Sequence, residues 1–152
     1  MIAKRSDLVL ERFVVVESHL SLLIPDDSTN LQPDEILNSY PVDINFSIEQ
    51  DVNIEFFRII TEIQINNCED KSPGYSISVT GIGFFKFSPD TKLNDEQKVQ
   101  TLQISGLSIC ITNLRSYISN QTSIFPWGSY TFHAVDIHAL LEDKQNPKPT
   151  PQ

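Results

Sequence analysis

The chain has 152 residues, of which 39% are hydrophobic and 20% are charged. This length and composition are typical of a single soluble globular domain and exclude an intrinsically disordered chain. A net charge of −9 disfavours nucleic acid and anionic membranes as partners, because both repel an acidic protein. Residues 1–76 carry fourteen acidic and five basic side chains, so the excess charge belongs to the first half, where it forms a solvated face or steers a basic partner.

The cysteines and the apolar runs indicate the compartment. Cys68 and Cys110 are too few for a disulfide framework. The chain opens with no apolar run long enough for a secretory signal, and no uncharged run approaches the roughly 20 residues that span a bilayer. We therefore expect a cytoplasmic protein with reduced thiols and no membrane insertion.

The first two-thirds of the chain have the pattern of β-strands. Residues 8–24 are rich in Val, Leu and Phe, and we expect one long strand that is bulged where Val14, Val15 and Val16 break the alternation. Turn-forming residues end this strand, and a loop is expected to follow around Pro33.

The clearest strand pattern lies in residues 42–49, where apolar and polar side chains alternate. A period of two places one face of a strand on the core and the other in water. Further strands are expected at residues 57–65 and 75–87. Because the connections between these strands are short, they favour an antiparallel meander.

The last third of the chain changes to helical spacing. Asn94 and Gln97 form a capping-box pattern, and apolar residues then recur at intervals of three and four. We expect a helix from Asn94 to Ser119, about 39 Å long at 1.5 Å per residue. Gly106 within it marks a break or a close helix contact.

The C-terminal part is expected to contain an extended segment, a short helix and a tail. Residues 130–135 read as extended, residues 137–144 as a short helix capped by Asp136, and the proline-containing residues 145–152 as a mobile tail. The sequence thus predicts a single α+β domain over residues 1–144. It is a four-stranded antiparallel meander sheet followed by a long helix and a short C-terminal helix.

Catalytic motifs are missing from the sequence, which has no G-x-S-x-G, P-loop or H-E-x-x-H pattern. His133 and His138 are five residues apart and share no helical face. A zinc site that combines them with Cys68 or Cys110 would need ligands from unrelated spacings. We therefore expect no catalytic residues, no metal and no other cofactor.

Large apolar side chains gather in the two long connections. The segment after the long helix contains Phe125, Trp127, Tyr130 and Phe132, and the loop after the first strand contains Leu31 and Tyr40. Aromatic residues in loops are typical of packing lids and also of binding surfaces. In addition, one sheet with one long helix leaves a face of each without cover, which self-association or a bound peptide would cover.

Three short motifs occur in a fixed order along the chain. LQPD at residues 31–34 leads to VDINF at residues 42–46, VTGIGFF occupies residues 79–85, and residues 130–141 read YTFHAVDIHALL. These motifs resemble three segments of SecB-type export chaperones. The first resembles the family's W-Q-P crossover loop and second strand, and the second resembles its V-Q-Q-x-G-I-F strand. The third resembles its L-x-L-x-P-V-N-F-x-A-L segment. That family includes SecB-like chaperones of toxin–antitoxin–chaperone systems, and its order of elements matches almost the full chain.

The resemblance implies a SecB-like fold and a holdase that binds unfolded polypeptides without ATP or catalysis. In this family, subunits pair through edge strands, and two dimers stack through the long helices into a homotetramer. Clients lie in apolar grooves, held by small apolar contacts and by strand-like backbone pairing. By position, the groove would be lined by Leu31 in place of the family's tryptophan, and by Tyr40, Phe125, Trp127, Tyr130 and Phe132.

Some positions depart from the export chaperones. Ser78 replaces an acidic residue that contacts the translocation motor SecA, Ala134 replaces a proline and Asp136 replaces an asparagine. The tail with Lys144 and Lys148 also differs from the motor-binding end of the family. These differences favour a dedicated client such as an antitoxin over preproteins that are delivered to SecA.

An alternative from another class is a small α+β enzyme or ligand-binding domain. His133, Asp136 and His138 would then be the polar groups of a pocket between the sheet and the helix. The holdase predicts dependence on Phe125 and Trp127, whereas the enzyme predicts dependence on the histidines. A subunit that binds one folded partner is also compatible with the sequence.

Overall fold

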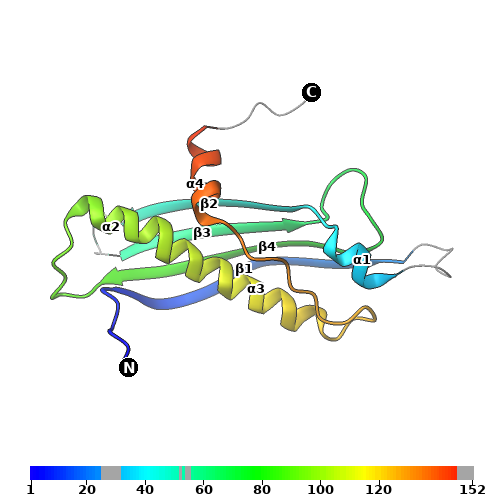
Figure 1. Ribbon diagram of the computed structural model, residues 1–152, viewed down its shortest axis with the longest axis horizontal. Coiled ribbons are helices and arrows are strands. Elements are labelled where there is room, and N and C mark those ends of the chain that lie inside the picture. Colours follow the sequence, from blue (N-terminus) through cyan, green and yellow to red (C-terminus); the bar gives the residue numbers. More distant parts are fainter. Residues whose placement is uncertain (25–31, 52, 54–55, 147–152) are drawn as a thin grey trace.

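The computed structural model describes residues 1–24, 32–51, 53 and 56–146 (Figure 1). Its strands are β1 (Leu8–Leu23), β2 (Val42–Asp51), β3 (Phe56–Ile65) and β4 (Gly74–Phe87). Its helices are α1 (Pro33–Asn38), α2 (Asp95–Thr101), η1 (Leu102–Gly106), α3 (Leu107–Thr122) and α4 (Ile137–Gln145). The expected fold is confirmed: a four-stranded antiparallel sheet is followed by a long helix and a short C-terminal helix.

The sheet has the order β1-β4-β3-β2, and each neighbouring pair is antiparallel. β2, β3 and β4 form a meander, whereas β1 pairs with β4 on the far side, so that β1 and β2 are the two edge strands. The register between β1 and β4 shifts between Leu10 and Arg12 and again between Val15 and Glu17. The second shift leaves Val16 56% exposed and confirms the bulge expected there.

Helix α1 lies in the segment for which the sequence predicted only a loop. Pro33 stands in its first turn, where the missing N–H costs no hydrogen bond. Asp34 and Glu35 in the same turn complement the positive end of the helix dipole. The loop prediction was wrong because a helix of six residues is too short to show an apolar period.

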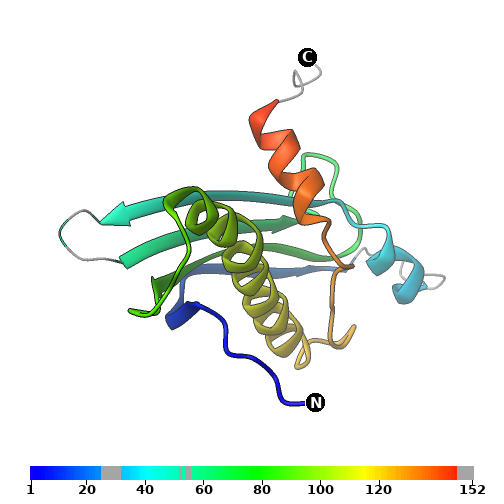
Figure 2. The ribbon, with the colours of Figure 1, turned by 60° about the vertical axis from the view of Figure 1, so that its left-hand side comes forward.

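α2, η1 and α3 form one helical run that crosses one face of the sheet (Figure 2). The expected capping box starts it: the Gln97 N–H donates to Asn94 Oδ1 over 2.9 Å, and the Asn94 N–H donates to Gln97 Oε1 over 3.0 Å. The run is interrupted by the π-helical turn η1, which ends at Gly106. A Cβ at Gly106 would lie 2.6 Å from Cδ1 of Ile59, so this glycine brings the run close to the sheet.

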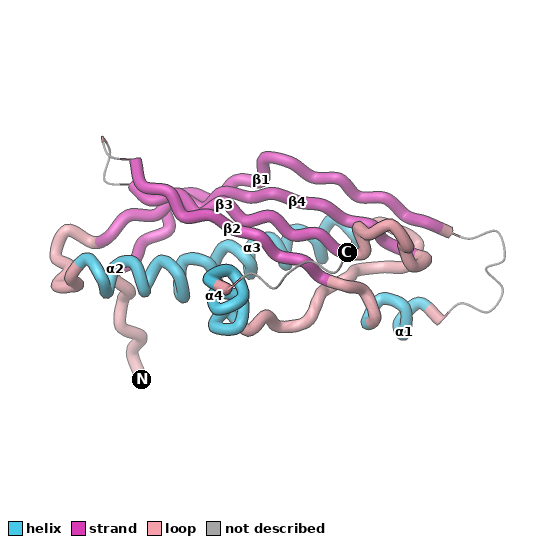
Figure 3. The backbone as a smooth tube through the Cα atoms, turned by 90° about the horizontal axis from the view of Figure 1, so that it is seen from above, coloured by secondary structure: helices cyan, strands magenta, loops and turns pink. Residues whose placement is uncertain are grey.

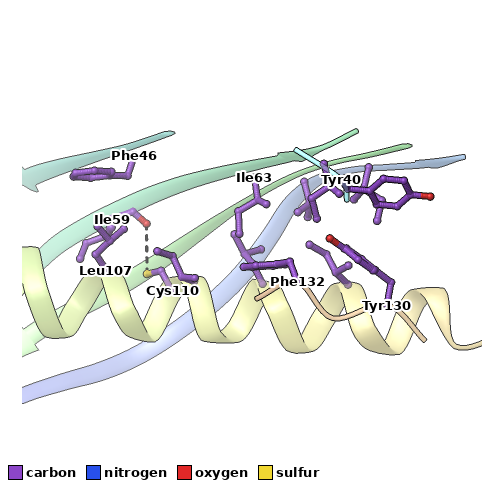
Figure 4. Packing of buried hydrophobic residues seen from close by; sticks show 14 of the residues in the cluster. Tyr40, Phe46, Ile59, Ile63, Leu107, Cys110, Tyr130 and Phe132 are labelled. Carbon is purple, nitrogen blue, oxygen red and sulfur yellow. Dashed lines mark hydrogen bonds between the residues drawn. The ribbon is translucent and has the colours of Figure 1, made fainter. Parts of the chain in front are cut away.

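The core lies between the sheet and α3 (Figure 4). Ile59 and Ile63 from β3 and Leu107 and Cys110 from α3 are completely buried, and burial raises the pKa of the Cys110 thiol to about 11. A Cβ at Gly83 of β4 would lie 2.6 Å from Cys110 Sγ, so the absence of a side chain at Gly83 leaves room for Cys110 of α3. Figure 3 shows that the helices lie on this one face of the sheet.

No helix in the described part of the chain is long and apolar enough to cross a membrane.

Candidate functional site

A groove runs between the edge strand β2 and the segment that leads into α4. Its main cavity has a volume of about 660 Å³. One wall consists of Val42, Asp43, Ile44, Asn45 and Phe46, and the other consists of His133, Ala134, Val135, Asp136, Ala139, Leu140, Asp143 and Lys144. The floor is apolar, since it is formed by half-buried or buried side chains: Val42, Ile44, Phe46, Val135 and Leu140. The charged lining residues are exposed at the rim and comprise three aspartates and one lysine.

Asp136 caps the first turn of α4 beside the groove. Its carboxylate accepts from the N–H groups of His138 over 3.0 Å and Ala139 over 3.2 Å, as an N-cap does. This confirms the cap that the sequence predicted. Because the carboxylate is held by the helix, Asp136 has a structural task that the enzyme hypothesis did not assign to it.

The outer edge of β2 faces this groove with backbone groups. In an antiparallel strand, the N–H and C=O of one residue point to the same side, and alternate residues point to opposite sides. The Phe46 N–H donates to Asn45 Oδ1 over 2.9 Å and the Phe46 C=O accepts from Lys144 Nζ, so both groups of Phe46 point away from β3. Those of Ile44 and Ile48 point the same way, and within the described ranges no hydrogen bond satisfies them.

An aromatic cluster adjoins the groove through the chain, since Tyr40 stands just before β2 and Phe132 just before His133. The Tyr40 hydroxyl donates to the Pro73 carbonyl over 2.7 Å and accepts from the Tyr75 N–H over 2.8 Å. The Tyr40 ring lies 5.6 Å from that of Tyr130, edge to face. Figure 4 shows these two rings close together at one end of the core. The burial of this cluster raises the pKa of Tyr130 to about 12 and that of Tyr40 as well.

The structure brings most of the predicted client-binding residues together, although they differ in exposure. Tyr40, Tyr130 and Phe132 are at most 5% exposed and pack inside the protein. Phe125 and Trp127 are half-buried on the turn after α3 and lie at the surface of the same cluster. Leu31 lies outside the described residues, as do residues 147–152 of the predicted tail.

Sequence reasoning missed Tyr75, which joins the cluster to the turn after α3. Its hydroxyl donates to the Gly128 carbonyl over 2.6 Å, and its ring lies 5.9 Å from that of Phe125. Gly74 beside it has a φ of +98°, and a Cβ there would lie 2.5 Å from Cζ3 of Trp127. In the sequence, the only sign of the contact between Tyr75 and the turn after α3 was Gly74 itself. A glycine between a polar loop and an aromatic strand residue can indicate a positive φ or a close approach of another segment.

The histidines do not meet in a pocket between the sheet and the long helix. That space is filled by completely buried side chains, including Ile63 and Leu114. His133 lies in the wall of the β2 groove, whereas His138 is an exposed residue of α4. Among the described residues, no group of three or more His, Cys, Asp or Glu side chains could hold a metal ion.

No family model matches the chain, and no curated protein matches it in sequence. Among solved structures, it is similar to the SecB-like chaperone Rv1957 of Mycobacterium tuberculosis, solved in complex with a ChAD peptide from the HigA1 antitoxin Rv1956. The TM-score is 0.61 at 10% identity, and the match covers 85% of this chain and 91% of that one. The chain has a SecB-like fold. A protein of unknown function from Streptococcus agalactiae has a TM-score of 0.38 at 12% identity, covering 84% of this chain and 97% of that one.

Proposed function

We propose that this protein is a SecB-like chaperone that holds an extended segment of a polypeptide client without ATP, and that the client is a dedicated one such as an antitoxin. The observation that carries the proposal is the groove beside β2, where an apolar floor lies next to outward backbone groups of Ile44 and Ile48 that make no hydrogen bond within the described residues. The similar chaperone of Mycobacterium tuberculosis was solved with an antitoxin peptide, which supports the same class of client here.

The chemistry of the groove suits a client that lacks its own secondary structure. An extended segment offers free N–H and C=O groups to an edge strand, and this pairing does not depend on side chains. Alternate client side chains would then contact the apolar floor formed by Val42, Ile44 and Leu140. A folded protein has no such free backbone, so the groove would discriminate unfolded from folded chains.

The aromatic residues divide into two proposed roles. Phe125 and Trp127 would contact the client directly, because they are half-exposed at the surface of the cluster. Tyr40, Tyr130 and Phe132 would support that surface from below, since their rings are buried. Leu31 is proposed as a further contact from the crossover segment.

The assembly and the cellular role are proposed by analogy with proteins of SecB-like fold. We propose a homotetramer, a dimer of dimers built through the edge strand β1 and the long helices, that works in the cytoplasm and leaves the β2 edge to the client. Ser78 lies on β4 where export chaperones carry an acidic residue, so delivery of preproteins to SecA is the less favoured role.

Size-exclusion chromatography with light scattering tests the proposal directly. The chains of 17.3 kDa should elute as a tetramer of about 70 kDa. Reduced and carboxymethylated α-lactalbumin, which stays unfolded, should co-elute, whereas native α-lactalbumin should not. A monomer that ignores both forms would refute the chaperone function.

Two variants test whether the aromatic cluster after α3 binds the unfolded client. Trp127→Ser removes a half-buried aromatic side chain at the surface of the cluster. We expect it to weaken binding of unfolded α-lactalbumin by at least tenfold when binding is measured well below the melting temperature of the variant, where circular dichroism shows that the variant is folded. His138→Ala serves as the control and should bind normally, because His138 is exposed on α4 and does not line the groove. Loss of binding in His138→Ala together with normal binding in Trp127→Ser would favour the enzyme or ligand-binding alternative.

A further inference from the structure

Lys144 divides the groove along β2 into two cavities. The main cavity, of about 660 Å³, ends at Phe46 and Lys144. On the other side of these two residues lies a second cavity of about 220 Å³, which is lined by Phe46, Ser47, Ile48, Gln103, Leu141, Lys144 and Gln145. Phe46 and Lys144 line both cavities, and of these two side chains Phe46 is buried whereas Lys144 is exposed.

The Lys144 ammonium occupies a position that an added strand would need. It donates to the Phe46 carbonyl and, over 3.1 Å, to Asn45 Oδ1, and it lies 4.4 Å from the centre of the Phe46 ring. Asn45 Oδ1 also accepts from the Phe46 N–H. Both outward backbone groups of Phe46 are therefore held by side chains of the same protein, whereas Ile44 and Ile48 on either side offer theirs to a partner.

The surroundings of this ammonium favour a cation. Asp43, Asp136 and Asp143 line the main cavity, and Lys144 is the one lysine or arginine among its lining residues. An ammonium or guanidinium over an aromatic ring is attracted by the ring quadrupole and gains strength when a carbonyl oxygen accepts from it. The position over the Phe46 ring therefore favours a cationic side chain, either Lys144 or a lysine or arginine of a bound client.

We infer that a client strand pairs with β2 on both sides of Phe46, displaces Lys144, and places its own lysine or arginine side chain over the Phe46 ring. The inference rests on the proposed chaperone function and names the segment that the groove selects: an extended stretch with a cationic side chain between apolar neighbours. Displacement requires movement of one side chain, because Lys144 stands on an exposed position of the last turn of α4.

A variant without the Lys144 ammonium tests the inference, because Lys144 would no longer compete with the cationic side chain of the client. The probe is a fluorescein-labelled peptide of twelve residues that alternates valine and threonine around one central lysine. Lys144→Met should bind it about fivefold more tightly than the wild type, a gain of about 1 kcal/mol. Lys92→Met removes the same charge from an exposed site outside the cavities described and should stay within twofold of the wild type. Equal or weaker binding by Lys144→Met overturns the inference.

A second measurement uses the wild-type protein, so it does not depend on how the variant folds. Replacing the central lysine of the peptide by norleucine should weaken binding about fivefold, whereas a terminal lysine should be replaceable without effect. N-methylation of the peptide backbone should weaken binding at alternate positions only, because alternate N–H groups face β2. Binding that is insensitive to these changes overturns the inference alone. Absence of binding by every peptide and by unfolded α-lactalbumin overturns the proposed function as well.

Discussion

Tyr40 was predicted from the sequence to contact a client, whereas its surroundings assign it to the packing of the fold. Tyr40→Phe keeps the ring and removes one hydroxyl, which donates to the Pro73 carbonyl and accepts from the buried Tyr75 N–H. A buried donor that loses its partner costs about 1–3 kcal/mol. We therefore expect a loss of about 2 kcal/mol in the free energy of unfolding, which for a chain of this size lowers Tm by about 4–8 °C.

Thermal unfolding followed by circular dichroism measures this loss, and urea unfolding provides the free energy. Tyr130→Phe is the matched control, because within the described residues the Tyr130 hydroxyl makes no hydrogen bond, so its removal should change Tm by less than the Tyr40 variant does. Binding of unfolded α-lactalbumin, measured well below Tm, should be unaffected by Tyr40→Phe. A Tyr40→Phe protein with unchanged Tm and at least tenfold weaker client binding would refute this reasoning and restore Tyr40 as a direct contact.

Two further predictions concern the cap of α4 and the thiols. Asp136→Ala removes the acceptor of two helix N–H groups and should destabilise the protein by about 1 kcal/mol; amide hydrogen exchange should increase in α4, and unchanged exchange would contradict the role of the cap. A disulfide reagent at pH 8 should modify Cys68, which is exposed, before Cys110, which is buried and whose pKa is raised to about 11. Unfolding in urea should make both thiols reactive, and rapid modification of both in the native protein would show that α3 opens away from the sheet.

Local chemistry explains why the elements of this fold were predictable. The alternation in residues 42–49 and the Asn94 capping box each describe a structure that forms within a few neighbouring residues. The same holds for the Asp136 cap of α4, which was also predicted and is present. By contrast, α1 is too short to produce a period, so its presence depends on contacts with the rest of the domain.

The candidate site depended on contacts that no local pattern contains. Periodicity cannot say that Lys144 reaches Phe46, because 98 positions separate them. Nor can it say which loop aromatics are buried: Tyr130 is buried because Tyr40 and Tyr75 pack against its ring, whereas Trp127 is left at the surface. The sequence shows only that these aromatic residues lie in loops. Their packing in the folded chain decides which of them are buried and which reach the surface.

The sequence by itself determined the class of the protein: an acidic α+β domain with four strands, a long capped helix and a short second helix. These features follow from side-chain period, capping and charge, which act over distances of a few residues. Only the tertiary structure decided that β1 pairs with β4, that β2 remains an open edge and that α4 lies beside it. Strand order and grooves arise from pairing between distant segments, and that pairing is decided by how the whole chain buries its apolar faces.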